Sequence, residues 1–178
     1  MAYKSFPDRT VFPIITPIDT YWRGLDIISE HWLRTKSYKG KKPDSDEFQE
    51  YMFWRKNLVI WTCCTIESFV NSEGVMWMGE QFYKDAIERQ NIVQKIRLIY
   101  AIKYNKILPS DKGVIKGVKK IFEIRNQFVH PKTRSIKDMG NADQMLKKLN
   151  SCNPTKLKNL VRSVNTLYYK DSNISKKN

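Results

Sequence analysis

Apolar residues recur every three or four positions along most of the chain, which is the spacing of an amphipathic α-helix. The first such segment begins at Pro17, with Thr16 as its cap, and extends to about Lys36. Further helices are predicted over residues 45–72, 80–89, 92–104, 110–130 and 153–169, with a short one ending near Asn150. No alternating pattern between hairpin turns indicates a strand. The predicted fold class is therefore all-α, a bundle of about five main helices.

Proline, glycine and polar residues divide the chain into segments. We predict an N-terminal arm over residues 1–15, a single all-α domain over 16–170 and a disordered tail over 171–178. Gly74 and Gly79 are expected to bracket a break after the second helix.

The second predicted helix is apolar on nearly all sides between Asn57 and Ser72, which indicates a central, buried helix. Glu67 is the only charged residue in that stretch. A buried carboxylate must find a partner or be neutralised, so we expect Glu67 to pair with a basic group such as Arg125.

Composition narrows the class of protein. Hydrophobic residues make up 41% of the 178 positions, which excludes a fully disordered chain. No apolar run approaches the roughly 18 residues of a membrane-spanning helix, and the N-terminus lacks a signal-peptide pattern. The three cysteines fit neither a disulfide framework nor a zinc site. We predict a cytoplasmic protein with no membrane association, no metal and no cofactor.

The basic residues are concentrated in the second half of the chain. Residues 1–90 carry 12 basic and 13 acidic side chains, whereas residues 91–178 carry 20 basic and 5 acidic ones. Such a division indicates a surface for a polyanion, although a generally lysine-rich surface would also produce it.

The segment from Ile115 to Thr133 contains the strongest candidates for residues that take part in chemistry. Arg125 interrupts a stripe of apolar residues that faces another helix or another subunit: Ile115, Val118, Phe122 and Val129. Asn126 and His130 share the adjacent face, and His130 ends the helix before Pro131. If the helix end frays, the three polar side chains can converge on one anionic group.

An arginine, an asparagine and a histidine suit the cleavage of a phosphodiester bond. Histidine transfers protons near neutral pH, and a guanidinium stabilises the charge that develops on a phosphate. The same residues also fit a structural role, in which Arg125 pairs with Glu67 in the core and His130 caps a carbonyl group.

The segment from Arg125 to His130 resembles the Arg-x(4–6)-His motif of HEPN domains, in the variant that has Asn directly after Arg. Residues 64–71, with Glu67 and Asn71, are similar to an earlier buried helix of that family in which a Glu and an Asn recur. The resemblance covers roughly residues 45–135 and implies Arg125, Asn126 and His130 as catalytic residues, supported by Glu67 and Asn71.

The resemblance implies a homodimer with two facing motif helices. It also implies a metal-independent endoribonuclease of the toxin or antiviral-defence type that leaves 2′,3′-cyclic phosphate ends, with RNA as substrate and a neutralising antitoxin or an accessory protein as partner. By similarity, His130 transfers a proton at the 2′-hydroxyl or leaving oxygen, Arg125 stabilises the phosphorane and Asn126 positions it.

Other functions remain open. Non-catalytic HEPN-like modules bind RNA, a nucleotide or a protein partner, and a purely structural helical protein is a third interpretation. Basic residues flank the motif and are candidates for contacts with the RNA backbone, or simply a solvated face: Lys119, Lys120, Lys132 and Arg134.

Overall fold

The described part of the computed structural model, residues 17–109, 112–129 and 140–169, is helical and contains no strand. The predicted all-α class is confirmed. The predicted N-terminal arm and C-terminal tail lie outside the described residues. The helices are α1 (Pro17–Arg34), α2 (Asp46–Met78), α3 (Glu80–Phe82), α4 (Ile92–Tyr104), α5 (Gly113–Val129), α6 (Gly140–Ser151) and α7 (Pro154–Tyr169). A 3₁₀ turn (Thr35–Tyr38) follows α1, and a π-helical turn (Tyr83–Ile87) follows α3.

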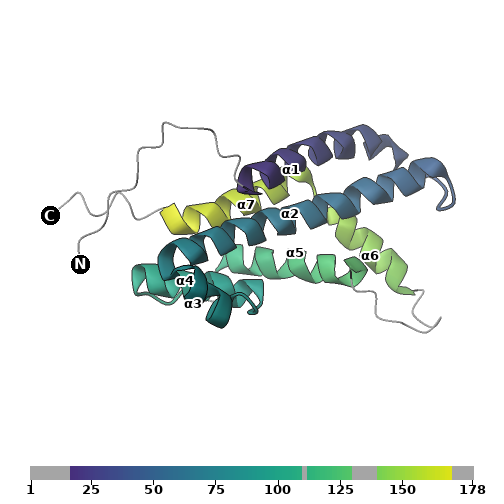
Figure 1. The fold of residues 1–178 in the computed structure, drawn as a ribbon. Coiled ribbons are helices and arrows are strands. Elements are labelled where there is room, and N and C mark those ends of the chain that lie inside the picture. The colour runs from purple at the N-terminus through teal and green to yellow at the C-terminus, as the bar shows by residue number, and fades with distance from the viewer. Residues whose placement is uncertain (1–16, 110–111, 130–139, 170–178) are drawn as a thin grey trace, which may run out of the picture.

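Helix α2 is the axis of the molecule. It is 33 residues long, and α1, α4, α5, α6 and α7 all pack against it (Figure 1). Ser45 caps its first turn by accepting a hydrogen bond of 3.2 Å from the backbone N–H of Phe48. Gly79 ends it with a φ of 80°, a conformation that glycine adopts without strain. The sequence prediction of a central second helix is confirmed.

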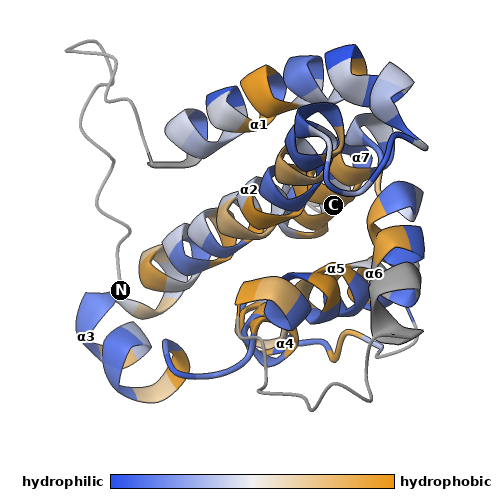
Figure 2. Cartoon of the chain, turned by 90° about the vertical axis from the view of Figure 1, so that its right-hand side faces the viewer, coloured by the Kyte–Doolittle hydropathy of each residue, from blue (hydrophilic) through white to orange (hydrophobic). Residues whose placement is uncertain are grey.

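The core forms where the apolar sides of the helices meet α2. Leu58, Val59 and Ile66 of α2 have no exposed surface. Helix α5 carries both hydrophobic and hydrophilic residues along its length, as expected for an amphipathic helix (Figure 2). The first part of its apolar stripe, including Val118 and Phe122, is buried within the same chain. These residues are therefore unavailable to a second subunit.

The structure corrects two details of the predicted element pattern. Helix α2 does not break at Gly74 but continues through it to Met78, so only Gly79 ends the helix. The helix predicted over residues 80–89 is instead divided into α3, of three residues, and the π-helical turn Tyr83–Ile87.

Gly74 is required by a close contact. A Cβ atom at this position would lie 2.3 Å from the ring of Tyr83 and 3.2 Å from Cδ1 of Ile99. Because Gly74 has no side chain, the π-helical turn and α4 can pack closely against α2, which itself remains a continuous helix.

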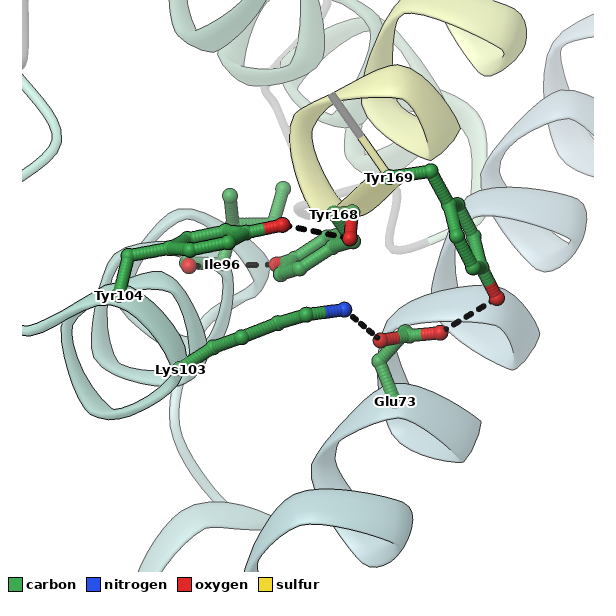
Figure 3. A network of polar contacts seen from close by, with 6 residues as sticks. All are labelled: Glu73, Ile96, Lys103, Tyr104, Tyr168 and Tyr169. Atoms are coloured by element: carbon green, nitrogen blue, oxygen red, sulfur yellow. Dashed lines mark hydrogen bonds and ion pairs between the residues drawn. The ribbon is translucent and has the colours of Figure 1, made fainter. Parts of the chain in front are cut away.

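A buried ion pair ties the C-terminal half of the bundle to α2 (Figure 3). Glu73 is 2% exposed; its carboxylate accepts hydrogen bonds from Lys103 Nζ at 3.3 Å and from Tyr169 Oη at 2.9 Å. The ammonium group of Lys103 also lies within 6 Å of four aromatic ring centroids, those of Trp77, Tyr104, Tyr168 and Tyr169. Such contacts stabilise a desolvated cation. The network thus joins α2, α4 and the last turn of α7.

Two further hydrogen bonds fix the same end of α7. Tyr104 Oη donates to the carbonyl of Tyr168 at 2.5 Å, and Tyr168 Oη donates to the carbonyl of Ile96 at 3.2 Å (Figure 3). Burial raises the pKa of the Tyr168 hydroxyl, so this donor keeps its proton.

No helix in the described ranges is both long enough and apolar enough to cross a membrane.

Gly74→Ala tests the close packing of α2 against Tyr83. Alanine normally stabilises a helix by about 1 kcal/mol over glycine, but here the added methyl group overlaps an aromatic ring, so we expect a net loss of about 1–3 kcal/mol. Gly113→Ala is the matched control, because a methyl group added there would have no other atom within 4 Å. Urea denaturation measures both variants, and equal stability of the two would contradict the packing described here.

Candidate functional site

Arg125 and Asn126, two of the three predicted catalytic residues, lie near the end of α5. Arg125 follows the buried residues Phe122 and Ile124, and its side chain is 24% exposed. Its Nη1 lies 3.5 Å from Oε1 of Glu67 on α2. The expected pairing of Arg125 with Glu67 is therefore confirmed.

The pair is not buried, contrary to the sequence expectation for Glu67. The Glu67 side chain is 38% exposed, and it borders an open cleft on this side of α2. Solvent screens an ion pair at this exposure, so its contribution to stability is small. The sequence did not reveal this open side, because uncharged residues surround Glu67 and two of them, Cys64 and Ser68, also line the cleft.

Arg125 and Asn126 point to different sides of α5. Successive helical residues are about 100° apart. Arg125 faces α2, whereas Asn126 is exposed. His130, Lys132 and Arg134 lie outside the described residues. The structure thus brings Arg125 together with Glu67, but it does not bring Arg125 and Asn126 onto one face.

The cleft beside Glu67 on α2 has a volume of about 640 Å³. Asn71, one helical turn after Glu67, also lines it, so both predicted supporting residues share this cleft. Its remaining walls come from α1, the end of α2 and the segment after Gly79, through Tyr21, Met76, Tyr83, Lys84 and Glu88 among others.

Asn71 organises one wall of the cleft. Its side-chain oxygen accepts hydrogen bonds from Tyr83 Oη at 2.5 Å and from Lys95 Nζ at 3.1 Å. Burial, with the nearby carboxylates of Glu88 and Glu67, raises the pKa of Tyr83 to about 12. Tyr83 therefore remains a hydrogen-bond donor to Asn71 at neutral pH.

Sequence reasoning missed Tyr83 and Lys95. Lys95 is 7% exposed and stands between Ile92 and Ile99 at helical spacing. The position of Lys95 within an apolar stripe could have identified it from the sequence. Tyr83 carried no such signal, because its burial depends on the absence of a side chain at Gly74.

The cleft is lined by the carboxylates of Glu67, Glu80 and Glu88 but by a single lysine, Lys84, so its charge does not favour a phosphate. Two of its carboxylates already pair with cations, Glu67 with Arg125 and Glu80 with Lys84, the latter at 2.6 Å. Burial, followed by the influence of Glu67, raises the pKa of the Cys64 thiol, so it is a poor nucleophile. Within the described ranges, no group of three or more His, Cys, Asp or Glu side chains is arranged to hold a metal ion.

The solvent-facing side of α5 is different in character. Lys112, Lys119 and Asn126 are exposed and recur every seven residues, about two helical turns. Lys116 and Lys120 are exposed beside them. In the part of the chain that the structure describes, none of these lysines forms an ion pair. We call these four lysines the lysine face.

Comparison with protein-family models, with curated proteins and with solved structures finds no match for the chain. The functional assignment therefore depends on the residues themselves, and the family resemblance of the motif stays a prediction.

The difference in burial between Glu67 and Glu73 predicts unequal effects of the same substitution. Glu73→Gln leaves Lys103, whose side chain is only 11% exposed, without its counter-ion, and we expect a loss of about 3–5 kcal/mol in the free energy of unfolding. Glu67→Gln breaks a solvent-screened pair and should cost less than about 1 kcal/mol. Urea denaturation of both variants measures the difference. Equal losses in the free energy of unfolding would show that Glu67 is as buried in solution as Glu73.

Proposed function

We propose that the protein acts on RNA as a metal-independent endoribonuclease of the HEPN type, with Arg125, Asn126 and His130 as its catalytic residues. The observation that carries the proposal is the lysine face, which leads along the exposed side of α5 to Asn126 and to the end of the motif helix. Unpaired lysines on a rigid helix attract a polyanion and position its phosphates beside the motif.

The proposed reaction needs only groups of the protein and of the RNA. The ribose 2′-oxygen attacks the adjacent phosphorus, the bond from phosphorus to the 5′-oxygen breaks, and a 2′,3′-cyclic phosphate forms. His130 accepts the proton of the 2′-hydroxyl or supplies one to the leaving oxygen, and the second copy of His130 in a homodimer performs the other transfer. Asn126 orients the phosphate.

Arg125 stabilises the phosphorane once it exchanges Glu67 for the phosphate. At 3.5 Å and partly exposed, the ion pair with Glu67 is weak, so a phosphate group with charge-assisted hydrogen bonds competes with it. Glu67 then acts as a holding partner that keeps the guanidinium at the end of α5 in the absence of RNA.

Apolar residues around the end of the motif helix support the proposed homodimer. Val129 is 40% exposed and Phe53 on α2 is 55% exposed. Both line a groove of about 730 Å³ that also includes Phe128 and Ile60. A second copy would therefore pack against this groove rather than against the whole apolar stripe of α5.

A non-catalytic module that binds RNA is the second candidate. The observation that favours it is the orientation of Arg125 toward Glu67, away from the face that carries Asn126 and the lysines. In that case the lysine face binds RNA and the motif stabilises the fold.

Cleavage of RNA in EDTA separates the two functions. We expect wild-type protein to cut total RNA and leave cyclic phosphate ends. His130→Ala and Arg125→Ala should each abolish cleavage, and the double variant should lose no more, because the residues act as a unit. Replacing the 2′-hydroxyl by hydrogen should also stop the reaction, since that oxygen is the nucleophile.

His31→Gln is the matched control, because His31 is the other histidine of the chain and stacks on Trp54 with ring centroids 4.1 Å apart. It should leave cleavage intact. Cleavage that survives His130→Ala, or that requires Mg²⁺, contradicts the proposed mechanism. RNA binding without any cyclic phosphate product establishes the binding module instead.

A further inference from the structure

The basic surface continues from α5 onto α7 along the seam where the two helices meet. A Cβ at Gly117 of α5 would lie 2.8 Å from Cδ1 of Leu160 on α7, so the helices approach closely here. Lys156 is exposed on α7 in its first turn, and α7 contains no acidic residue. Burial raises the pKa of the Cys152 thiol, and the positive charges of Lys120 and Lys156 partly offset this rise, so both ammonium groups lie near the same residue. Lys156 therefore extends the lysine face across the seam.

The other end of the seam opens into a groove of about 550 Å³. Lys112 at the start of α5 lines one side, and Ser163 and Thr166 of α7 line the other. Along α5, the distance from Lys112 to Lys120 is about 12 Å at 1.5 Å per residue. The groove and the lysines thus form one continuous band.

The two hydroxyl groups in the groove are hydrogen-bond acceptors. Ser163 Oγ donates its proton to the carbonyl of Asn159 at 2.8 Å, and Thr166 Oγ1 donates to the carbonyl of Arg162 at 2.7 Å. Because their protons are engaged, their oxygen lone pairs are left for an external donor. A phosphate offers no donor at neutral pH, whereas a ribose 2′-hydroxyl does.

The described aromatic rings closest to the band are held by contacts within the fold. Tyr100, the aromatic residue that lines the groove, is half-buried and packs against Tyr104 with ring centroids 4.8 Å apart. Phe122 of α5 is buried, and Tyr169 at the end of α7, although 55% exposed, is fixed by the hydrogen bond from its hydroxyl to Glu73. Proteins that bind single strands use exposed aromatic rings, whereas duplex RNA is recognised through its phosphates and 2′-hydroxyls.

We infer that the α5–α7 seam binds the sugar–phosphate backbone of double-stranded RNA. Lys116, Lys120 and Lys156 contact phosphates, and Ser163 and Thr166 accept hydrogen bonds from ribose 2′-hydroxyls. This inference rests on the proposed function in taking RNA as the substrate, and it specifies a structured RNA whose duplex part is held outside the catalytic residues.

Fluorescence anisotropy tests the inference with a labelled RNA duplex of about 16 base pairs, the length that double-stranded RNA-binding domains span. A DNA duplex of the same sequence and a polyuridine strand of the same length are the comparison probes. All proteins carry His130→Ala, so that cleavage does not alter the probes. The seam variant combines Lys116→Gln, Lys120→Gln and Lys156→Gln. The matched control combines Lys39→Gln, Lys41→Gln and Lys42→Gln, which removes the same charge from the exposed connection between α1 and α2.

We expect the RNA duplex to bind more tightly than polyuridine or the DNA duplex. The seam variant should weaken duplex binding roughly tenfold or more and reduce the slope of log K against log salt by about three, one unit per lysine. The control variant should stay close to the parent. Ser163→Ala with Thr166→Ala should reduce the preference for RNA over DNA.

Equal losses in the seam and control variants, or tighter binding of polyuridine than of the duplex, would overturn the inference. An unchanged preference for RNA over DNA in the double alanine variant would overturn the role of the two hydroxyl groups. Duplex binding at the seam combined with absence of cleavage by the wild-type protein rejects the proposed nuclease and supports the seam. Cleavage by the wild-type protein without duplex binding at the seam rejects the seam alone.

Discussion

The packing of the other long helices around α2 is the constraint on which the rest of the structure depends. Helix α2 buries residues such as Leu58 and Ile66 against its neighbours but leaves Glu67 partly exposed beside an open cleft. The apolar residues of α5 are buried against α2 and its neighbours α4, α6 and α7. Its lysines are therefore directed to solvent, and Arg125 is directed to Glu67.

Helix α5 consequently has two chemically distinct sides. Its inner side ends in Arg125, held loosely by an exposed carboxylate. Its outer side carries exposed lysines up to Asn126 and meets α7 at the close contact between Gly117 and Leu160. Under the proposed function the outer side binds the RNA backbone. Cleavage additionally requires Arg125 to exchange Glu67 for a phosphate at the end of the helix.

The sequence was sufficient to predict the helical class, the central position of α2 and the pairing of Arg125 with Glu67, because these follow from apolar spacing and from an isolated charge. The partial exposure of Glu67 could not be predicted from the sequence, because burial depends on which neighbouring helix covers which side of α2. The continuity of α2 through Gly74 was likewise missed, because the contact with Tyr83 is tertiary. The seam between α5 and α7 joins residues about 40 positions apart, and no local pattern marks it.

Chemical labelling of lysines, read by mass spectrometry with and without a structured RNA, tests the central claim most directly. It reports on the unmodified chain and needs no assumption about catalysis. If the α5–α7 seam is the RNA-binding surface, RNA should protect Lys116, Lys120 and Lys156 from acetylation and leave Lys39 and Lys41 as reactive as before. Uniform protection of all lysines, or protection of Lys39 and Lys41 without the seam, would contradict the account.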